Sequence, residues 1–208
     1  MTYIYDQKMH HKGWGVIVLA SLFYCYQFIV RVFPNALHTD LMQHLNLDAQ
    51  QLGFVISTYG WAYSLMQIPL GLALDRYGPK LLVSAACLIC AGGCMVFAFS
   101  TTQELAAVGR FMMGMGSSCG FLSCVKLATL WLPPHLLSRS IALTLVFGTI
   151  GASMGGGPLY KLNEAIGVKN TLQFLGVVGI VLGLILLKFI QNIHHTQHIP
   201  RKSHKDSF

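Results

Sequence analysis

The feature that most constrains the fold of this chain is a series of long apolar runs separated by short polar connections. A helix needs about 20 mostly apolar residues to cross the hydrocarbon of a membrane. Hydrophobic residues make up 54% of the 208 residues and charged residues only 10%, against about a quarter charged in a typical soluble domain. The sequence therefore predicts an all-α membrane protein in a lipid bilayer with six transmembrane helices, at approximately 14–33, 52–74, 80–99, 105–131, 140–160 and 172–193.

The chain divides into three expected parts: a cytoplasmic N-terminal segment (1–13), the six-helix bundle (14–193) and a basic cytoplasmic tail (194–208). The first apolar run is too long for the core of a signal peptide and no small-residue cleavage site follows it, so we expect it to remain as a span. The tail is rich in His and could bind metal, but it lacks Cys, which favours a solvated tail. The net charge of +7 does not indicate nucleic-acid binding, because most basic residues lie in short gaps between apolar runs.

Loop charges predict the orientation, because cytoplasmic loops carry an excess of Lys and Arg. If both termini are cytoplasmic, the outer loops hold only Lys161 and Lys169. The cytoplasmic side then holds nine basic residues: Lys8, Lys12, Arg76, Lys80, Arg139, Lys188, Arg201, Lys202 and Lys205. We therefore expect a multi-pass protein of the bacterial inner membrane with both termini in the cytoplasm.

Several helix ends carry recognisable signals. Gly78 and Pro79 are expected to open the third helix, and Pro133-Pro134 to end the fourth. The first helix is expected to continue beyond Phe33 with a kink at Pro34, because a helical stripe of apolar residues runs on to Leu45. Capping boxes or near variants are predicted at three starts: Asp48 with Gln51, Thr101 with Glu104, and Asn170 with Gln173.

The six cysteines all lie inside apolar runs, and Cys87 and Cys90 form a CxxC. That pattern alone could indicate redox or metal chemistry. No His or acidic residue accompanies it in the segment, so we interpret these cysteines as small packing residues and expect no cofactor and no metal. An enzyme is not expected either, because every His lies at a terminus or in a loop, away from the serines of the spans.

Residues 71–80, GLALDRYGPK, separate the second and third apolar runs. The sequence predicts a Gly-bounded turn that presents Asp75, Arg76 and Lys80 at the membrane edge, with Gly71 and Gly78 around them. This spacing resembles the loop signature of the major facilitator superfamily of transporters. The resemblance implies a cytoplasmic conformational-switch loop, whose Asp75 caps a helix end in the partner half and stabilises the outward-facing state. Pro79 stands where many members have a second basic residue.

Two further stretches carry the same resemblance, which extends from about Gly13 to Asn192. Gly109-Arg110 through Gly116 is similar to the fourth-helix pattern with its intramembrane Arg. The fifth helix of the family is Gly- and Pro-rich, bends and packs tightly, a role that the resemblance gives here to Gly151, Gly155, Gly157 and Pro158. The chain thus resembles the N-terminal six-helix half of a major facilitator, a 3+3 repeat bundle. The stretch YCYQFIVRVFP resembles a branch with an Arg in the first helix, which includes organic-anion carriers and nutrient or amino-acid transporters of intracellular bacteria.

Charged residues inside spans are candidates for substrate binding, because they usually face a cavity or a partner. Arg31 shares a helical face with Tyr24 and Gln27, and an Arg can hold a carboxylate with two parallel hydrogen bonds. The alternative is an Arg that snorkels to the outer interface. In the second helix, Gln67 shares a face with small and polar residues, which could line a cavity or only pack against another helix: Ser57, Gly60, Ser64 and Gly71.

Two more cations lie in the fourth span. Arg110 should lie about 12 Å into a helix that starts near Thr102, where it could meet substrate or bind backbone carbonyls of the bundle. Lys126 lies near the cytoplasmic end, where snorkelling and a functional role are both open. None of the seven acids lies mid-span, so an anionic or zwitterionic substrate is the easier hypothesis, with the proton as a candidate coupling ion.

The sequence therefore predicts a secondary active transporter, or its N-terminal half, that moves a small organic anion, amino acid or similar metabolite by alternating access. A carrier of this kind needs about twelve spans. We therefore expect a second six-helix half, either as a second copy of the chain or as a separate chain. The alternative is a transport-inactive fragment that only associates with other membrane proteins.

Overall fold

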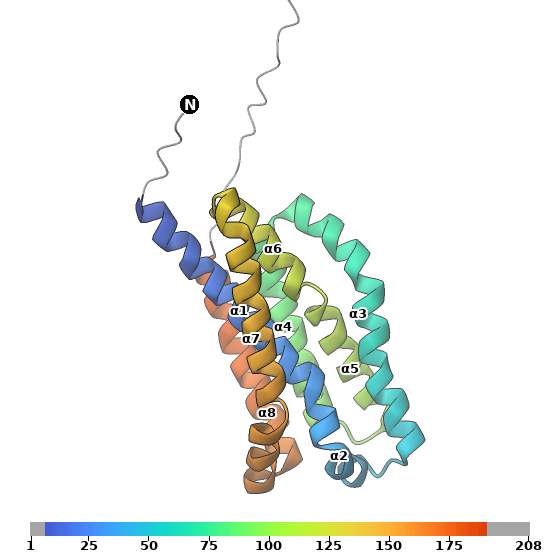
Figure 1. The fold of residues 1–208 in the computed structure, drawn as a ribbon. Coiled ribbons are helices and arrows are strands. Elements are labelled where there is room, and N and C mark those ends of the chain that lie inside the picture. The colour runs from blue at the N-terminus through green and yellow to red at the C-terminus, as the bar shows by residue number, and fades with distance from the viewer. Residues whose placement is uncertain (1–6, 191–208) are drawn as a thin grey trace, which may run out of the picture.

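The computed structural model describes residues 7–190, and this part of the chain is helical without any strand. The long helices form a single bundle (Figure 1), which confirms the all-α prediction. The predicted tail and its histidines lie outside the described residues. In chain order the elements are α1 (Gln7–Ala36), α2 (His38–Leu45), α3 (Ala49–Tyr77), α4 (Pro79–Ala98), α5 (Gln103–Ser117), α6 (Gly120–Trp131), the 3-10 helix η1 (Pro134–Leu136), α7 (Leu137–Met154) and α8 (Gly157–Phe189).

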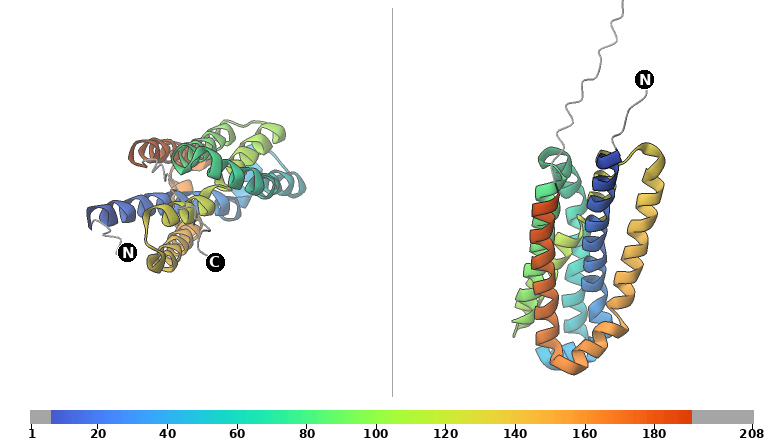
Figure 2. Two further views of the ribbon diagram at one scale, coloured as in Figure 1. Left: turned by 90° about the horizontal axis from the view of Figure 1, so that it is seen from above. Right: turned by 90° about the vertical axis from the view of Figure 1, so that its left-hand side faces the viewer.

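The connections of the bundle separate into two ends. The start of α1, the α3–α4 turn, η1 and the C-terminal end of α8 lie at one end, and α2 and the first part of α8 lie at the other (Figures 1 and 2). Arg76, Lys80 and Arg139 therefore lie at the same end as the two described termini, whereas Lys161 and Lys169 lie at the opposite end. The direction in which this bundle crosses a membrane remains a prediction.

Five helical segments of the described chain are long and apolar enough to cross a membrane: Gly13–Ala36, Pro79–Ala98, Gln103–Trp131, Pro134–Met154 and Gly157–Phe189. They correspond to five of the six predicted spans. The remaining helix, α3, has sufficient length at 29 residues but is not among these apolar segments. It lies alongside the others in the bundle (Figure 1), and the polar residues that lower its apolarity include Gln50, Gln51, Ser57, Thr58, Ser64 and Gln67.

Local signals explain two of the helix starts. Asp48 forms the predicted capping box, in which its Oδ1 accepts from the Gln51 backbone N–H at 2.7 Å and the Gln51 Oε1 accepts from the Asp48 N–H at 3.0 Å. Gly78 is the single residue between α3 and α4 and has a φ of 79°, a conformation that glycine adopts readily. Pro79 then opens α4, where its missing N–H leaves no hydrogen bond unmade.

Two other predicted caps are wrong. Thr102, not Thr101, caps α5, since its Oγ1 accepts the backbone N–H of Leu105 at 3.3 Å. Asn170 starts no helix, because it lies inside α8 and donates to the Ile166 carbonyl at 2.8 Å. The break in α8 lies instead at Gly167, whose φ is 82°.

The apolar stripe of the first span continues past Phe33, as predicted. Pro34 lies inside α1, and the chain bends at Leu37 before α2. Leu37, Leu41 and Leu45 are all buried, so the stripe keeps this outer extension packed on the bundle.

The predicted fifth span ends earlier than expected, because α7 stops at Met154 and α8 begins at Gly157. Gly151 and Gly155 face the backbone of α1. A Cβ at Gly151 would come within 2.9 Å of the Cys25 carbonyl carbon, so only glycine permits this approach. Gly157 has no atom within 4 Å of a Cβ position, and it serves with Pro158 to start α8 rather than to pack against a neighbour.

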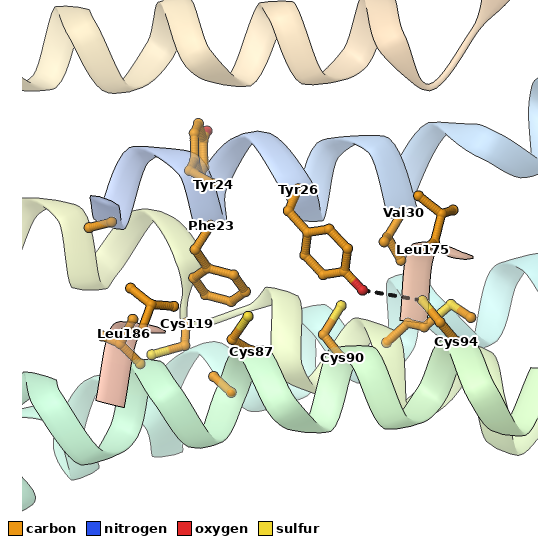
Figure 3. Packing of buried hydrophobic residues seen from close by; sticks show 14 of the residues in the cluster. Phe23, Tyr24, Tyr26, Val30, Cys87, Cys90, Cys94, Cys119, Leu175 and Leu186 are labelled. Carbon is orange, nitrogen blue, oxygen red and sulfur yellow. Dashed lines mark hydrogen bonds between the residues drawn. The ribbon is translucent and has the colours of Figure 1, made fainter. Parts of the chain in front are cut away.

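The core between α1 and α4 contains aromatic and sulfur-bearing side chains. Tyr26 points from α1 towards Cys90 and Cys94 of α4, and its hydroxyl lies 3.6 Å from the Cys94 Sγ (Figure 3). On the other side of α4, a Cβ at Gly93 would lie 2.7 Å from the Gly109 carbonyl oxygen of α5. Small residues thus bring α4 and α5 into close contact. The contact lies at Gly109, the residue that precedes Arg110 in the chain.

Candidate functional site

Arg31 lies on the exposed side of α1, three residues before Pro34. Its guanidinium carbon lies 5.7 Å from the ring centroid of Phe28 in its own helix and 5.7 Å from that of Tyr63 in α3. Among the described residues it makes no salt bridge. A guanidinium that packs against aromatic rings through its π face retains its N–H edge for a planar acceptor. Substrate binding by Arg31 stays a prediction.

Tyr63 contacts Arg31 and was not among the predicted site residues. Its ring stacks on Tyr59, with centroids 6.2 Å apart and planes at 14°. The ring centroid of Tyr59 lies in turn 4.7 Å from the guanidinium carbon of Arg110. The spacing of four residues predicts that the two tyrosines touch, but their position between two arginines appears only when α3 packs against α1 and α5.

The predicted polar face of α1 is divided by the fold. Tyr24 is 8% exposed and Gln27 is 3% exposed, whereas Arg31 is exposed. Tyr24 contacts Phe28 and Phe121, with ring centroids 5.0 and 5.7 Å away. The structure therefore brings these two predicted substrate-binding side chains into the interior behind the Arg31 face.

Gln27 packs on the start of α6. A Cβ at Gly120 would lie 2.9 Å from the Gln27 side-chain carbonyl carbon. Its Oε1 has no hydrogen-bond partner in the part of the chain that the structure describes. This acceptor is thus free for a donor that rearrangement of the bundle or a bound molecule would supply.

Gln67 lies on an exposed face of α3. Ser57, Gly60 and Ser64 on the same predicted face are also exposed, and a Cβ at Gly60 would have nothing within 4 Å. The structure confirms that these residues share a face, and it leaves that face uncovered in the single chain. Large apolar side chains are exposed beside it, including Trp61, Leu65, Ile68 and Leu72.

Arg110 is buried, with 1% of its surface exposed. Its Nη1 donates to the Val30 backbone carbonyl of α1 at 2.9 Å and lies 3.4 Å from the Met113 Sδ. Its guanidinium carbon also lies 5.2 Å from the ring centroid of Phe33. This geometry matches the expectation of an Arg that binds a backbone carbonyl of the bundle, and direct contact with substrate stays a prediction.

The predicted switch loop is almost entirely helical. Asp75 and Arg76 lie in the last turn of α3 and Lys80 in the first turn of α4, so Gly78 alone is non-helical, and Gly71 lies inside α3. The connection is therefore shorter than the turn expected between the spans at 52–74 and 80–99, because the helical pattern runs up to Tyr77.

Asp75 forms an ion pair across the bundle. The Lys126 Nζ of α6 lies 2.7 Å from the Asp75 Oδ1, and the two side chains are 36% and 68% exposed. The pair links α3 to α6, the C-terminal half of the fourth span, which gives Lys126 a specific contact. Capping of a helix in a partner half by Asp75 stays a prediction.

The described cysteines are free and buried, and no three potential metal-ligating side chains cluster in residues 13–190, whose side chains the structure describes. A groove of about 450 Å³ lies at the end of the bundle opposite the Asp75–Lys126 pair, between α2 and the first part of α8. It is lined by Asp40, His44, Asn163 and Glu164, among others. The Asn163 Nδ2 donates to the Asp40 Oδ2 there. Sequence reasoning did not predict this groove, because its two walls are 123 residues apart in the chain.

Comparison with known families tests the resemblance of the sequence motifs. The sequence model described as Major Facilitator Superfamily matches residues 17–207. The chain belongs to the major facilitator superfamily. The identification agrees with the helical bundle and confirms the predicted family, while the branch with an Arg in the first helix remains a prediction.

Curated relatives of this major facilitator are transporters rather than enzymes. Probable galactarate/D-glucarate transporter GarP of Escherichia coli (strain K12) is 26% identical over 203 residues, which cover 95% of this chain and 45% of that protein. Probable sulfoacetate transporter SauU of Cupriavidus necator is 25% identical over 185 residues, which cover 89% and 42%. Probable anion transporter 6 of Oryza sativa subsp. japonica is 24% identical, covering 94% and 46%.

Solved structures show the same fold. A bacterial homologue of the human lysosomal transporter Spinster, inward-facing and unoccupied, aligns with a TM-score of 0.77 at 19% identity over 86% of this chain and 43% of that chain. The chain thus spans about half the length of the relatives that it matches. This proportion agrees with the fold expected of one six-helix half of a major facilitator.

Proposed function

We propose that this chain forms one half of a secondary transporter that moves a small organic anion across a membrane by alternating access. The observation that carries the proposal is Arg31, a cation without an anionic partner among the described residues, presented on the open side of α1. Curated relatives named for galactarate, D-glucarate and sulfoacetate transport support an anionic substrate. The proposed substrate is therefore a small carboxylate or sulfonate that Arg31 binds through two parallel hydrogen bonds.

Tyr24, Gln27 and Gln67 complete the proposed site in different ways. Gln67 shares an open surface with Arg31's neighbour Tyr63 on α3, whereas Tyr24 and Gln27 are buried and would meet substrate only after the helices move. We add Tyr63 to the site because its ring contacts the Arg31 guanidinium.

A second six-helix half is part of the proposal. The uncovered face of α3 combines small, polar and large apolar side chains, a composition suited to helix packing in a membrane. A Gly60→Cys variant tests whether that half is a second copy of this chain or a separate chain. Spontaneous disulfide-linked dimers in membranes would support a second copy of this chain, and a partner that is crosslinked only in coexpression would support a separate chain.

The test of transport is uptake into proteoliposomes of radiolabelled D-glucarate, galactarate and sulfoacetate, with and without a pH gradient. Arg31→Ala should lower uptake at subsaturating substrate about 10- to 100-fold, because a hydrogen bond to a charged group contributes about 1.5–3 kcal/mol. Arg139→Ala, which removes an exposed cation at the cytoplasmic end, is the matched control and should leave uptake unchanged. Equal uptake by wild type and Arg31→Ala would contradict the site, and a gradient that leaves uptake unchanged would contradict proton coupling.

A further inference from the structure

A proline in α1 leaves one backbone carbonyl without its normal partner. In an α-helix the carbonyl of residue 30 accepts the N–H of residue 34. Residue 34 is proline, which has no N–H. The Val30 carbonyl is therefore open inside the bundle, immediately before Arg31.

Arg110 supplies the missing donor. Its Nη1 reaches the Val30 carbonyl from α5 at 2.9 Å, and its guanidinium lies between the rings of Phe33 and Tyr59, with centroids 5.2 and 4.7 Å away. Val30 and Phe33 both belong to the turn of α1 that Pro34 interrupts. Arg110 therefore contacts this turn twice, at the Val30 carbonyl and at the Phe33 ring.

The electrostatics of the site agree with this role. No carboxylate pairs with Arg110 in residues 7–190, although a buried charge without compensation is costly. A free helical carbonyl carries partial negative charge, and the rings of Phe33 and Tyr59 present electron-rich faces to a cation. The break in α1 and the buried cation therefore compensate each other in part, through Nη1, while the Arg110 Nε has no hydrogen-bond partner in the part of the chain that the structure describes.

We propose that Arg110 is a positioning residue that replaces the N–H absent from Pro34 and thereby fixes the α1 backbone from which Arg31 projects. The role of Arg31 as substrate anchor rests on the proposed function. The hydrogen bond from Arg110 to the Val30 carbonyl does not depend on the proposed function, so it can be tested without any substrate.

The test is a double-mutant cycle on thermal unfolding of the purified protein in detergent. Arg110→Met removes the donor and keeps most of the side-chain volume, and we expect it to lower Tm by about 5 °C. Pro34→Ala restores the N–H to α1, so adding Arg110→Met to that variant should lower Tm by less than half as much. Pro69→Ala, at the proline inside α3, is the control and should give no such relief. If Arg110→Met lowers Tm equally in the wild-type, Pro34→Ala and Pro69→Ala backgrounds, the proposal is overturned.

A second measurement reports the position of residue 31 itself. The Arg31→Cys variant is labelled with a water-soluble methanethiosulfonate, with the wild-type chain and its buried cysteines as background. Arg110→Met should change the labelling rate about threefold or more through local opening, and Pro34→Ala should return it towards the starting rate. A rate unaffected by Arg110→Met would overturn the positioning role. Should Arg110→Met not fold, Arg110→Leu, which also lacks a donor, gives the same comparison in the same backgrounds.

Discussion

The contact between α7 and α1 at Gly151 gives the sharpest prediction of stability. A Cβ at this position would lie 2.9 Å from the Cys25 carbonyl carbon and 3.0 Å from its Cα. These are backbone atoms, so Gly151→Ala must push two helices apart rather than rotate a side chain. Gly15 of α1 is a matched position, because a Cβ there would meet nothing within 4 Å.

The comparison of the two variants isolates the steric cost. Replacing Gly by Ala inside a helix favours the helix by about 1 kcal/mol, and this gain is common to Gly151→Ala and Gly15→Ala. Overpacking costs about 1–3 kcal/mol and applies only to Gly151→Ala. Since 1 kcal/mol shifts Tm by about 2–4 °C in a chain of this size, Gly151→Ala should unfold roughly 2–12 °C below Gly15→Ala.

Thermal unfolding followed with a thiol-reactive fluorophore is a suitable assay, because the described cysteines are buried and become reactive only on unfolding. Both variants are measured in the same detergent at the same protein concentration. A Gly151→Ala variant that unfolds at or above the temperature of Gly15→Ala would refute the reasoning that the glycine is required by the approach of the two backbones.

Three further predictions concern the ends of the bundle. Asp75→Asn should lower the free energy of unfolding by less than about 1 kcal/mol, since the ion pair with Lys126 is largely exposed. The loss should shrink in 1 M salt, and a loss that persists there would contradict an ionic origin. Asp48→Ala should cost about 0.5–2 kcal/mol through loss of the cap, measured by thermal unfolding, and no change would contradict the capping box. In intact cells, an impermeant thiol reagent should label Lys161→Cys and not Arg139→Cys, and the reverse pattern would invert the proposed orientation.

The features that the sequence predicts well are those determined by neighbouring residues. Asp48 and Gln51 form their capping box from residues three apart, and Gly78 with Pro79 marks a helix boundary by backbone geometry alone. The errors are also local. Two adjacent threonines offer equivalent capping oxygens, so the choice of Thr102 over Thr101 depends on where packing starts α5.

The candidate site was less predictable because its contacts join distant segments. Arg31 and Arg110 were visible in the sequence as charged residues inside apolar runs, whereas Tyr63 was not singled out. Their arrangement depends on the close approach of α4 and α5 at Gly93 and Gly109, which places Arg110 against α1. The pairing of Asp75 with Lys126 across 51 residues likewise has no local signal.

The single-residue connection at Gly78 limits how the bundle can deform. Consecutive Cα atoms are about 3.8 Å apart, and Pro79 fixes its own φ directly after the glycine, so the hairpin has almost no slack. When α3 tilts, α4 must follow it. Movement of α4 then displaces α5, because the two helices pack closely at Gly93 and Gly109. Three helices would then move together as one unit, and Arg110 of that unit would carry the Val30 turn of α1 with it.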